Sequence, residues 1–207
     1  MMTIPKKYED LTVEQFQQLE ALKTNIHLEQ IDVACRRLSI LSGKDIDYIE
    51  SLSPTVVYNH LLDALYLNQP LLTMDCPESF TLGFKKFKYV SEISQYTVAQ
   101  QKDFTEFLKQ NDNDYIKCLP QLMAICHLEL SLKGWVYDSS THKKNVELFK
   151  KSKLKDSLGG VFFYSKFLIN YSTILKDFLE ESMIAIASLT NDEEFQDFLN
   201  NGDGSTQ

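Results

Sequence analysis

The stretch Ser79–Val90, which reads SFTLGFKKFKYV, decides between a purely helical fold and a mixed one. Apolar and polar side chains alternate along it, and a period of two is typical of a half-buried β-strand. The pattern predicts a β-hairpin near residues 79–90, with Lys85 and Lys86 at its tip. Because a lone hairpin is only marginally stable in water, we expect it to pack on helices or on another chain.

Helical patterns precede and follow the hairpin. Thr12 and Thr97 each begin a Thr-Val-x-Gln sequence, in which the threonine and the glutamine have the spacing of a capping box. The two copies could mark an internal duplication, but their flanking segments differ, which favours two independent capping boxes. Further helices are predicted over 28–41 with Gly43 at the end, from Pro54 to about Leu67, over 115–130, in a Lys-rich segment that Ser140 or Thr141 can cap, and over 158–189. Gly134–Asp138 is expected to be a short extended loop.

The sequence therefore predicts a mainly α fold (α+β), a multi-helix domain with one inserted β-hairpin near residues 79–90. A chain of 207 residues has the size of one domain or of two small ones. We expect one compact domain with four regions. They are an N-terminal helical region (1–70), a loop with the hairpin (71–95), a C-terminal helical region (96–189) and an acidic tail (190–207).

The charge balance argues against nucleic acid as a partner. The chain has 21 Lys and Arg against 29 Asp and Glu, which gives a net charge of -8. An acidic surface repels phosphate backbones. Only Arg36 and Arg37 are arginines, and bidentate recognition of phosphates and bases depends mainly on arginine. We expect no direct nucleic-acid binding.

Charge is also unevenly spread along the chain. Six lysines crowd residues 143–155, whereas residues 190–207 carry five carboxylates and no basic side chain. Opposite charges on two segments of one chain could join neighbouring copies head-to-tail. The alternative interpretation is a solvated helix face and a soluble tail.

Cysteine usage and hydropathy indicate a soluble protein in a reducing compartment. Cys35, Cys76, Cys118 and Cys126 form no Cys-x-x-Cys pair, and no secretory signal precedes them. No apolar run approaches the roughly 18 residues that cross a bilayer. We therefore expect free thiols and no membrane partner.

Catalytic signatures are missing from the sequence, which contains no motif of nucleotide-binding, metalloprotease or hydrolase chemistry. Cys118, Cys126 and His127 come nearest to a metal cluster, but we interpret them as buried thiols and a buried histidine. His142 beside the hydroxyl residues 139–141 could imitate a base and its nucleophile, but adjacent residues at a capped helix start seldom reach that geometry, and a helix start explains them more simply. The sequence predicts no catalytic residue, no cofactor and no metal.

Aromatic residues are unusually abundant, with 13 Phe and 10 Tyr against one Trp. Phe and Tyr are enriched in protein interfaces, so part of this surface could be covered only by a partner. The alternative is that all of it lies in the core. Gly159–Gly160 in the aromatic segment predicts a helix break or a close helix contact. The candidate interaction residues are Phe84, Lys85, Lys86, Phe87, Tyr89, Lys150, Lys151, Phe162, Phe163, Phe167, Asp192, Glu193 and Glu194.

Several pieces of the chain, taken in order, are similar to one family. The opening Ile4–Phe16 (IPKKYEDLTVEQF) matches a pattern of proline, an aromatic residue and then Leu/Ile-Thr-x-x-Gln-Phe/Tyr. The later pieces are Leu41–Lys44, Ile49–Leu52, Phe84–Val90, Tyr96–Gln100, Val136–Asp138 with His142, and Val146–Phe149. In these pieces the sequence resembles structural-module proteins from tailed phages of Bacteroides-type gut bacteria, including the crAss-like phages.

The resemblance implies a non-enzymatic virion component of the head–tail connector or tail, acting through protein–protein contacts in a ring-like homo-oligomer. Its partners would be portal, connector or tail proteins, in the virion and, during assembly, in the host cytoplasm. The alternative is a tail assembly chaperone that is absent from the mature particle. An enzyme with dispersed residues (His127, His142, Glu147) and a DNA-binding regulator have weaker support, because each group has a structural explanation and the chain is acidic.

Overall fold

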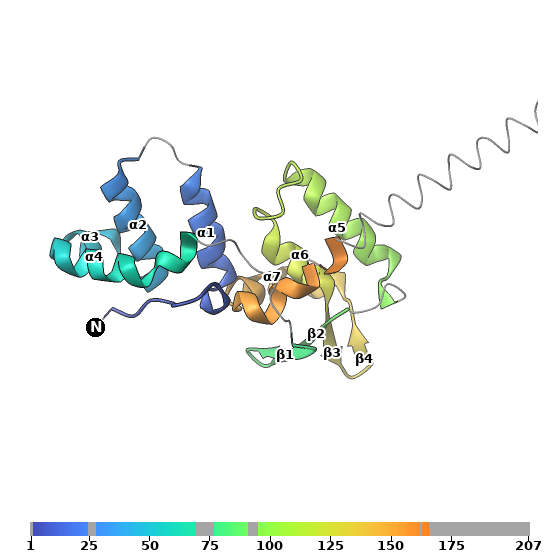
Figure 1. Cartoon of the computed structure of the whole chain (residues 1–207). Coiled ribbons are helices and arrows are strands. Elements are labelled where there is room, and N and C mark those ends of the chain that lie inside the picture. Colours follow the sequence, from blue (N-terminus) through green and yellow to red (C-terminus); the bar gives the residue numbers. More distant parts are fainter. Residues whose placement is uncertain (1, 25–27, 69–76, 91–94, 162, 166–207) are drawn as a thin grey trace, which may run out of the picture. The chain divides into compact units, whose positions relative to one another are not determined.

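The computed structural model of the chain describes residues 2–24, 28–68, 77–90, 95–161 and 163–165. Contacts divide the chain into a compact unit, Met1–Tyr164, and a second unit, Ser165–Gln207. The described residues belong almost entirely to the first unit, which combines helices with one small antiparallel sheet (Figure 1). The predicted fold class, mainly α with an inserted β-hairpin, is confirmed.

Helices dominate the N-terminal region (Figure 1). Its described elements are η1 (Tyr8–Asp10), α1 (Val13–Lys23), α2 (Gln30–Ser42), α3 (Ile46–Glu50), α4 (Pro54–Asp63) and η2 (Leu65–Asn68). Gly43 ends α2 in the left-handed conformation at φ +66°, as predicted, because a residue without a Cβ adopts it at little cost. Ser53 and Pro54 begin α4 as predicted. The helix predicted to continue to about Leu67 ends earlier, and η2 follows as a 3-10 turn.

Both predicted capping boxes are present. Thr12 caps α1 and Thr97 caps α5 (Val98–Gln110); each threonine hydroxyl accepts from the glutamine N–H, and the glutamine Oε1 accepts from the threonine N–H. The amide Nε2 of each glutamine then donates to carbonyls in the last turn of the following helix. These carbonyls belong to Ile40 and Leu41 in α2 for Gln15, and to Ile125 in α6 (Leu119–Cys126) for Gln100. Each glutamine therefore satisfies polar groups at two helix ends.

The predicted hairpin consists of β1 (Ser79–Leu82) and β2 (Lys85–Tyr89), paired antiparallel. Leu82 faces Lys85, so the connecting turn is Gly83–Phe84. Gly83 has φ +59°, and glycine at the first position is favoured in two-residue hairpin turns. The predicted tip at Lys85 and Lys86 is therefore wrong, and both lysines lie in β2.

Two further strands complete the sheet. β3 (His127–Ser131) pairs antiparallel with β2, and β4 (Gly134–Val136) pairs with β3, which gives the order β1-β2-β3-β4. The helix predicted over 115–130 is confirmed only as α6; from His127 onward that prediction is wrong. The predicted loop at 134–138 supplies β4 instead. Pairing of His127 with Tyr89 of β2 outweighs the local helical spacing.

Aromatic side chains join one face of the sheet to α7 (His142–Lys150). The Phe149 ring of α7 lies 5.1 Å from the ring of Phe87 and 5.1 Å from that of His127, and Phe80 lies 5.3 Å from His127. Residue 160, in the helical stretch 154–161, packs on the same cluster. A Cβ on Gly160 would come within 2.9 Å of the His127 ring, so this helical stretch does make a close contact, and it makes it with strands β2 and β3 of the sheet.

Main-chain hydrogen bonds tie the start of α1 to the segment that follows α7. Val13 N–H donates to the Ser152 carbonyl at 3.0 Å, and Leu154 N–H donates to the Leu11 carbonyl at 2.9 Å. Leu11, Val13 and Leu154 are fully buried. These bonds join the N-terminal helices to the segment that follows α7 within one compact unit.

Candidate protein-interaction surface

The sheet has one buried face and one exposed face. Side chains alternate along a strand, so the register separates the two sets. The inner face, which packs on α7, contains Phe80, Phe87, His127 and Glu129. The opposite, outer face contains Thr81, Lys86, Lys88, Leu128, Leu130 and Trp135, of which only Leu128 is buried.

Two lysines of β2 lie over the single tryptophan on the outer face. The Nζ of Lys88 is 5.3 Å from the centre of the Trp135 ring, and the Nζ of Lys86 is 6.0 Å from it. These distances allow cation–π attraction. Neither lysine forms an ion pair within the described part of the chain. Leu130, the cross-strand neighbour of Trp135, is 46% exposed, so positive charge and apolar surface meet on this face.

The turns of both hairpins carry fully exposed apolar side chains. Phe84 lies in the β1–β2 turn and Leu132 in the β3–β4 turn, and each has a relative exposure of 108%. Because β2 and β3 are antiparallel, both turns emerge at the same end of the sheet. Single exposed apolar residues are common, but a gathering of them marks a contact surface. We name this set the sheet-end surface: Phe84, Lys86, Lys88, Leu130, Leu132 and Trp135.

A polar network on the inner face holds the first hairpin against α7. Lys85 Nζ lies 2.8 Å from Glu129 Oε2 and donates to Asn145 Oδ1 at 3.0 Å. Asn145 Nδ2 donates to the same Glu129 oxygen at 3.1 Å. Asn145 is buried, whereas the side chains of Lys85 and Glu129 are 28% and 21% exposed, so the network is partly shielded from water. The network holds the start of β2, and with it the exposed Gly83–Phe84 turn, in a fixed position relative to α7.

The hairpin residues predicted to form an interface divide between core and surface. Phe84 and Lys86 are exposed, as an interface requires. Lys85 belongs to the polar network, and Tyr89 is half-buried opposite His127. The prediction that Phe87 contacts a partner is wrong, because Phe87 is fully buried against Phe149.

The Lys-rich helix lies beside the hairpin, so two regions predicted separately come together. Lys150 pairs with Glu147 at 2.7 Å, and Lys151 is exposed at the end of α7. Phe163 is partly exposed. The remaining predicted interaction residues lie outside the described residues, as does the expected contact with the acidic tail: Phe162, Phe167, Asp192, Glu193 and Glu194.

His127 is a core residue, as predicted. Its Nδ1 lies 2.7 Å from the Met123 carbonyl, and its Nε2 has no hydrogen-bond partner in the described structure. Burial lowers the pKa of His127 to about 4, opposed in part by the bond to Met123. The ring is therefore neutral at pH 7, with a proton on Nδ1 that it donates to the carbonyl.

The other candidate reactive groups are also absorbed into the packing. Cys35, Cys118 and Cys126 are free and buried, as predicted, and burial raises the pKa of each thiol, for Cys118 to about 11. Such thiols are poor nucleophiles at neutral pH. His142 stacks on Phe107 with the ring centres 5.1 Å apart, and burial lowers its pKa. Its ring nitrogens find no hydrogen-bond partner among the described atoms.

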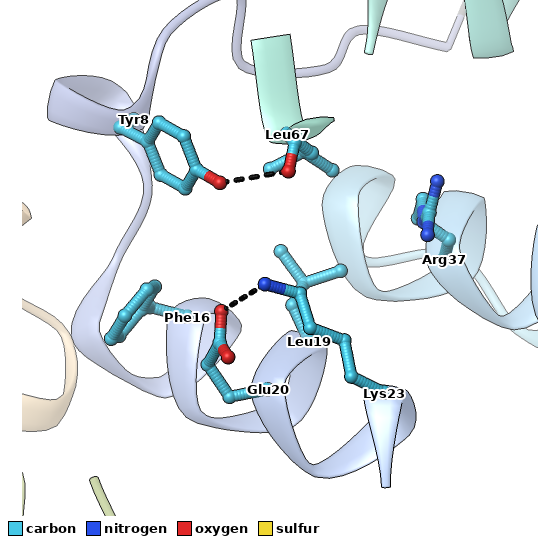
Figure 2. A pocket seen from close by; sticks show the side chains of 7 residues that line it. All are labelled: Tyr8, Phe16, Leu19, Glu20, Lys23, Arg37 and Leu67. Carbon is cyan, nitrogen blue, oxygen red and sulfur yellow. Dashed lines mark hydrogen bonds and ion pairs between the residues drawn. The ribbon is translucent and has the colours of Figure 1, made fainter. Parts of the chain in front are cut away.

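The crevice between α1, η1 and η2 is too small for a metabolite (Figure 2). Its volume of about 10 Å³ holds roughly one water. Tyr8 Oη donates to the Leu67 carbonyl at 2.9 Å, and Lys23 pairs with Glu20 at 2.6 Å at the rim. Nowhere in the described ranges do three or more His, Cys, Asp or Glu side chains gather as a metal site. None of the described helices combines the length and apolar character needed to cross a membrane.

Sequence reasoning missed part of the sheet-end surface, namely Lys88, Leu130, Leu132 and Trp135. A signal was present, because Leu128 and Leu130 alternate with Glu129 and Ser131 in a strand-like period. The same leucines also follow Ile125 and Cys126 at the helical spacings i+3 and i+4, so the local pattern fits a helix as well. Register with β2, which sequence does not give, decides between the two.

Comparisons with protein-family models, with curated proteins and with solved structures find no match to the chain. The function of the sheet-end surface is therefore inferred from its own chemistry and from the sequence resemblance given above.

Proposed function

We propose that the chain is a non-enzymatic structural or assembly protein of a tailed phage, which binds other proteins through the sheet-end surface. The observation that carries the proposal is the gathering of Phe84, Leu132 and Trp135 with two lysines that lack ion pairs in the described structure. Aromatic and other apolar residues form the centres of protein interfaces, with charged groups at their rims. The phage setting rests on the resemblance of pieces such as Ile4–Phe16 and Phe84–Val90.

The sheet-end surface suits a partner with an apolar depression. Phe84 and Leu132 project from turns, so both can enter a pocket with little rearrangement of the strands. Full burial of such side chains contributes about 1.5–3 kcal/mol each. Lys86 and Lys88 would then face carboxylates at the rim of that pocket, which favours one orientation of the partner.

The state of the reactive side chains supports a role without catalysis. His127 and Cys126 are buried in packed surroundings, and His142 stacks on an aromatic ring. A general base must reach the proton that it removes, and within the described structure neither His127 Nε2 nor the ring nitrogens of His142 have a hydrogen-bond partner that they could activate.

Within this proposal the chain is a resident connector or tail component, arranged with its copies in a ring and in contact with portal, connector or tail proteins. A tail assembly chaperone, absent from the mature particle, is the alternative. Mass spectrometry of purified particles and of the infected-cell lysate tests both. A fixed stoichiometry with the portal supports the resident component, and abundance in the lysate alone supports the chaperone. A chain found in neither complexes nor particles of the phage would overturn the proposal.

A further inference from the structure

An apolar groove of about 340 Å³ runs between α2 and the α4–η2 segment, separate from the sheet-end surface. One wall consists of Gln30, Val33, Ala34 and Arg37, with the spacing i, i+3, i+4, i+7. The other wall repeats that spacing with Leu61, Ala64, Leu65 and Asn68. The stripe on α2 spans about 10 Å at the helical rise of 1.5 Å per residue, whereas the opposite wall passes from the end of α4 into the 3-10 turn η2.

The groove is apolar in its middle and open to solvent. Ala34 and Ala64 are small, so a third backbone can approach closely between the walls. Leu65 is 55% exposed, and Ile31 on α2 and Leu62 on α4, which do not line the groove, are 60% and 45% exposed. Leaving this much aliphatic surface in water gives no advantage to the isolated fold, because burial of each such side chain would be favourable.

Arg37 is the only charged residue among those that line the groove. In the part of the chain that the structure describes, its guanidinium forms no ion pair. An arginine fork matches a carboxylate with two parallel hydrogen bonds. The groove therefore offers one specific polar anchor beside an apolar strip.

We propose that the α2–α4 groove binds an amphipathic helix of a partner protein, whose carboxylate, placed beside its apolar stripe, pairs with Arg37. Helices dock in grooves through their own apolar side chains at i, i+3, i+4 and i+7. The apolar residues of the two walls, Val33 and Ala34 on one side and Leu61, Ala64 and Leu65 on the other, give such a stripe a surface on which to pack. The apolar middle excludes a purely acidic peptide, and a single arginine is too little for a nucleic-acid backbone. The groove is defined by the described residues and stands independently of the proposed phage role.

The test uses the full chain and a labelled synthetic 16-residue helical peptide. Leucines occupy i, i+3, i+4 and i+7 of the peptide, and one Glu flanks that stripe; a second peptide has Gln in place of the Glu. Fluorescence anisotropy measures both affinities for the native chain, for Arg37→Gln and for Arg36→Gln. Arg36 is exposed on the same helix but does not line the groove, so it is a matched control.

We expect the Glu peptide to bind the native chain about tenfold more tightly than it binds Arg37→Gln, which is the usual size of a charge-assisted hydrogen bond. The Gln peptide should lose the same factor on the native chain and nothing further on Arg37→Gln. Arg36→Gln should bind as the native chain does. Equal losses for Arg36→Gln and Arg37→Gln, or equal affinities of the two peptides, would overturn the pairing.

Leu65→Lys tests whether the apolar strip of the groove contributes to peptide binding. Leu65→Lys changes an exposed wall residue and should weaken the Glu peptide at least tenfold, whereas Val98→Lys, at an exposed apolar position of α5, should not. Circular dichroism checks that both variants melt as the native chain does. Unchanged binding by Leu65→Lys, or a change of oligomeric mass on Arg37→Gln without peptide, would overturn the proposal; the latter would assign the groove to a second copy.

Discussion

In β2 the side chain of Phe87 is fully buried against Phe149, whereas its neighbours Lys86 and Lys88 lie over Trp135 on the other face of the same sheet. The inner face fills the core and fixes the hairpin through the Lys85–Glu129–Asn145 network. The outer face buries Leu128 but leaves Thr81, Lys86 and Leu130 exposed, and its two turns carry the exposed side chains of Phe84 and Leu132. One strand thus supplies stability through every second residue and a contact surface through the others.

The largest expected effect separates Phe87 from Phe84. Phe87→Ala removes a ring from a closed aromatic cluster and should lower the free energy of unfolding by about 3–5 kcal/mol. Phe84→Ala changes a fully exposed turn residue and should stay within about 0.5 kcal/mol. Urea unfolding of both variants measures the difference. A cost for Phe84→Ala near that of Phe87→Ala would remove the distinction between the faces.

The inner face should also make stability depend on pH through His127. Its pKa is lowered to about 4 from an ordinary 6.5. Between pH 4 and pH 6.5 the His127 ring is therefore protonated in the unfolded chain and neutral in the folded chain. The contribution of His127 to the free energy of unfolding does not change with pH above about pH 6.5. It decreases by about 3 kcal/mol in total as the pH falls from there to about 4. Unfolding curves from pH 7 to 4 measure the slope.

His127→Gln should remove that part of the slope. His142→Gln is the matched control, because the pKa of His142 is lowered in the same direction at a less buried position, and it should remove less. A slope that survives His127→Gln unchanged would show that other groups carry it.

The next largest loss of stability is expected for a substitution at Gly160. A Cβ there would lie 2.9 Å from the His127 ring and 3.1 Å from Tyr89 Cβ, closer than packed atoms tolerate. Gly160→Ala should therefore destabilise the fold by about 1–2 kcal/mol, although alanine is the better helix former by about 1 kcal/mol. In the His127→Ala background the cost should shrink, which a double-mutant cycle measures. If Gly160→Ala lowered the free energy of unfolding equally in both backgrounds, the His127 ring would not be the group that the new Cβ contacts.

The smallest effects are expected on the outer face. Lys86→Ala and Lys88→Ala remove exposed cation–π contacts with Trp135, and each should change the free energy of unfolding by no more than about 0.5 kcal/mol. Thermal unfolding measures both. A loss above about 1 kcal/mol would mean that these lysines support the fold, which their place on the proposed contact surface does not require.

Local signals in the sequence predicted much of this fold. The two Thr-Val-x-Gln capping boxes, the Gly43 helix end and the hairpin pairing of β1 with β2 follow from neighbouring residues, and each is present. The alternation predicts the turn at Lys85–Lys86, two residues after its place at Gly83–Phe84, where Gly83 accepts a positive φ.

The second hairpin depends on non-local pairing, which no local pattern contains. Leu128 and Leu130 fit both a helix and a strand, and contact of His127 with Tyr89 decides for the strand. For the same reason the division of hairpin residues into Phe87 inside and Lys86 outside required the position of α7. The α2–α4 groove likewise arises from two segments whose packing the sequence does not state.

Cross-linking in infected cells tests most directly whether the sheet-end surface is the contact surface. An amine-reactive cross-linker and mass spectrometry would compare three lysines with an exposed control, Lys109 on α5. The three are Lys86 and Lys88 of the sheet-end surface and Lys133, which follows Leu132 in the β3–β4 turn. We predict intermolecular cross-links concentrated at the sheet-end lysines, and their loss in a Phe84→Ser, Leu132→Ser double variant that melts at the native temperature. Cross-links spread equally over Lys109, or retained in the double variant, would contradict the proposed surface.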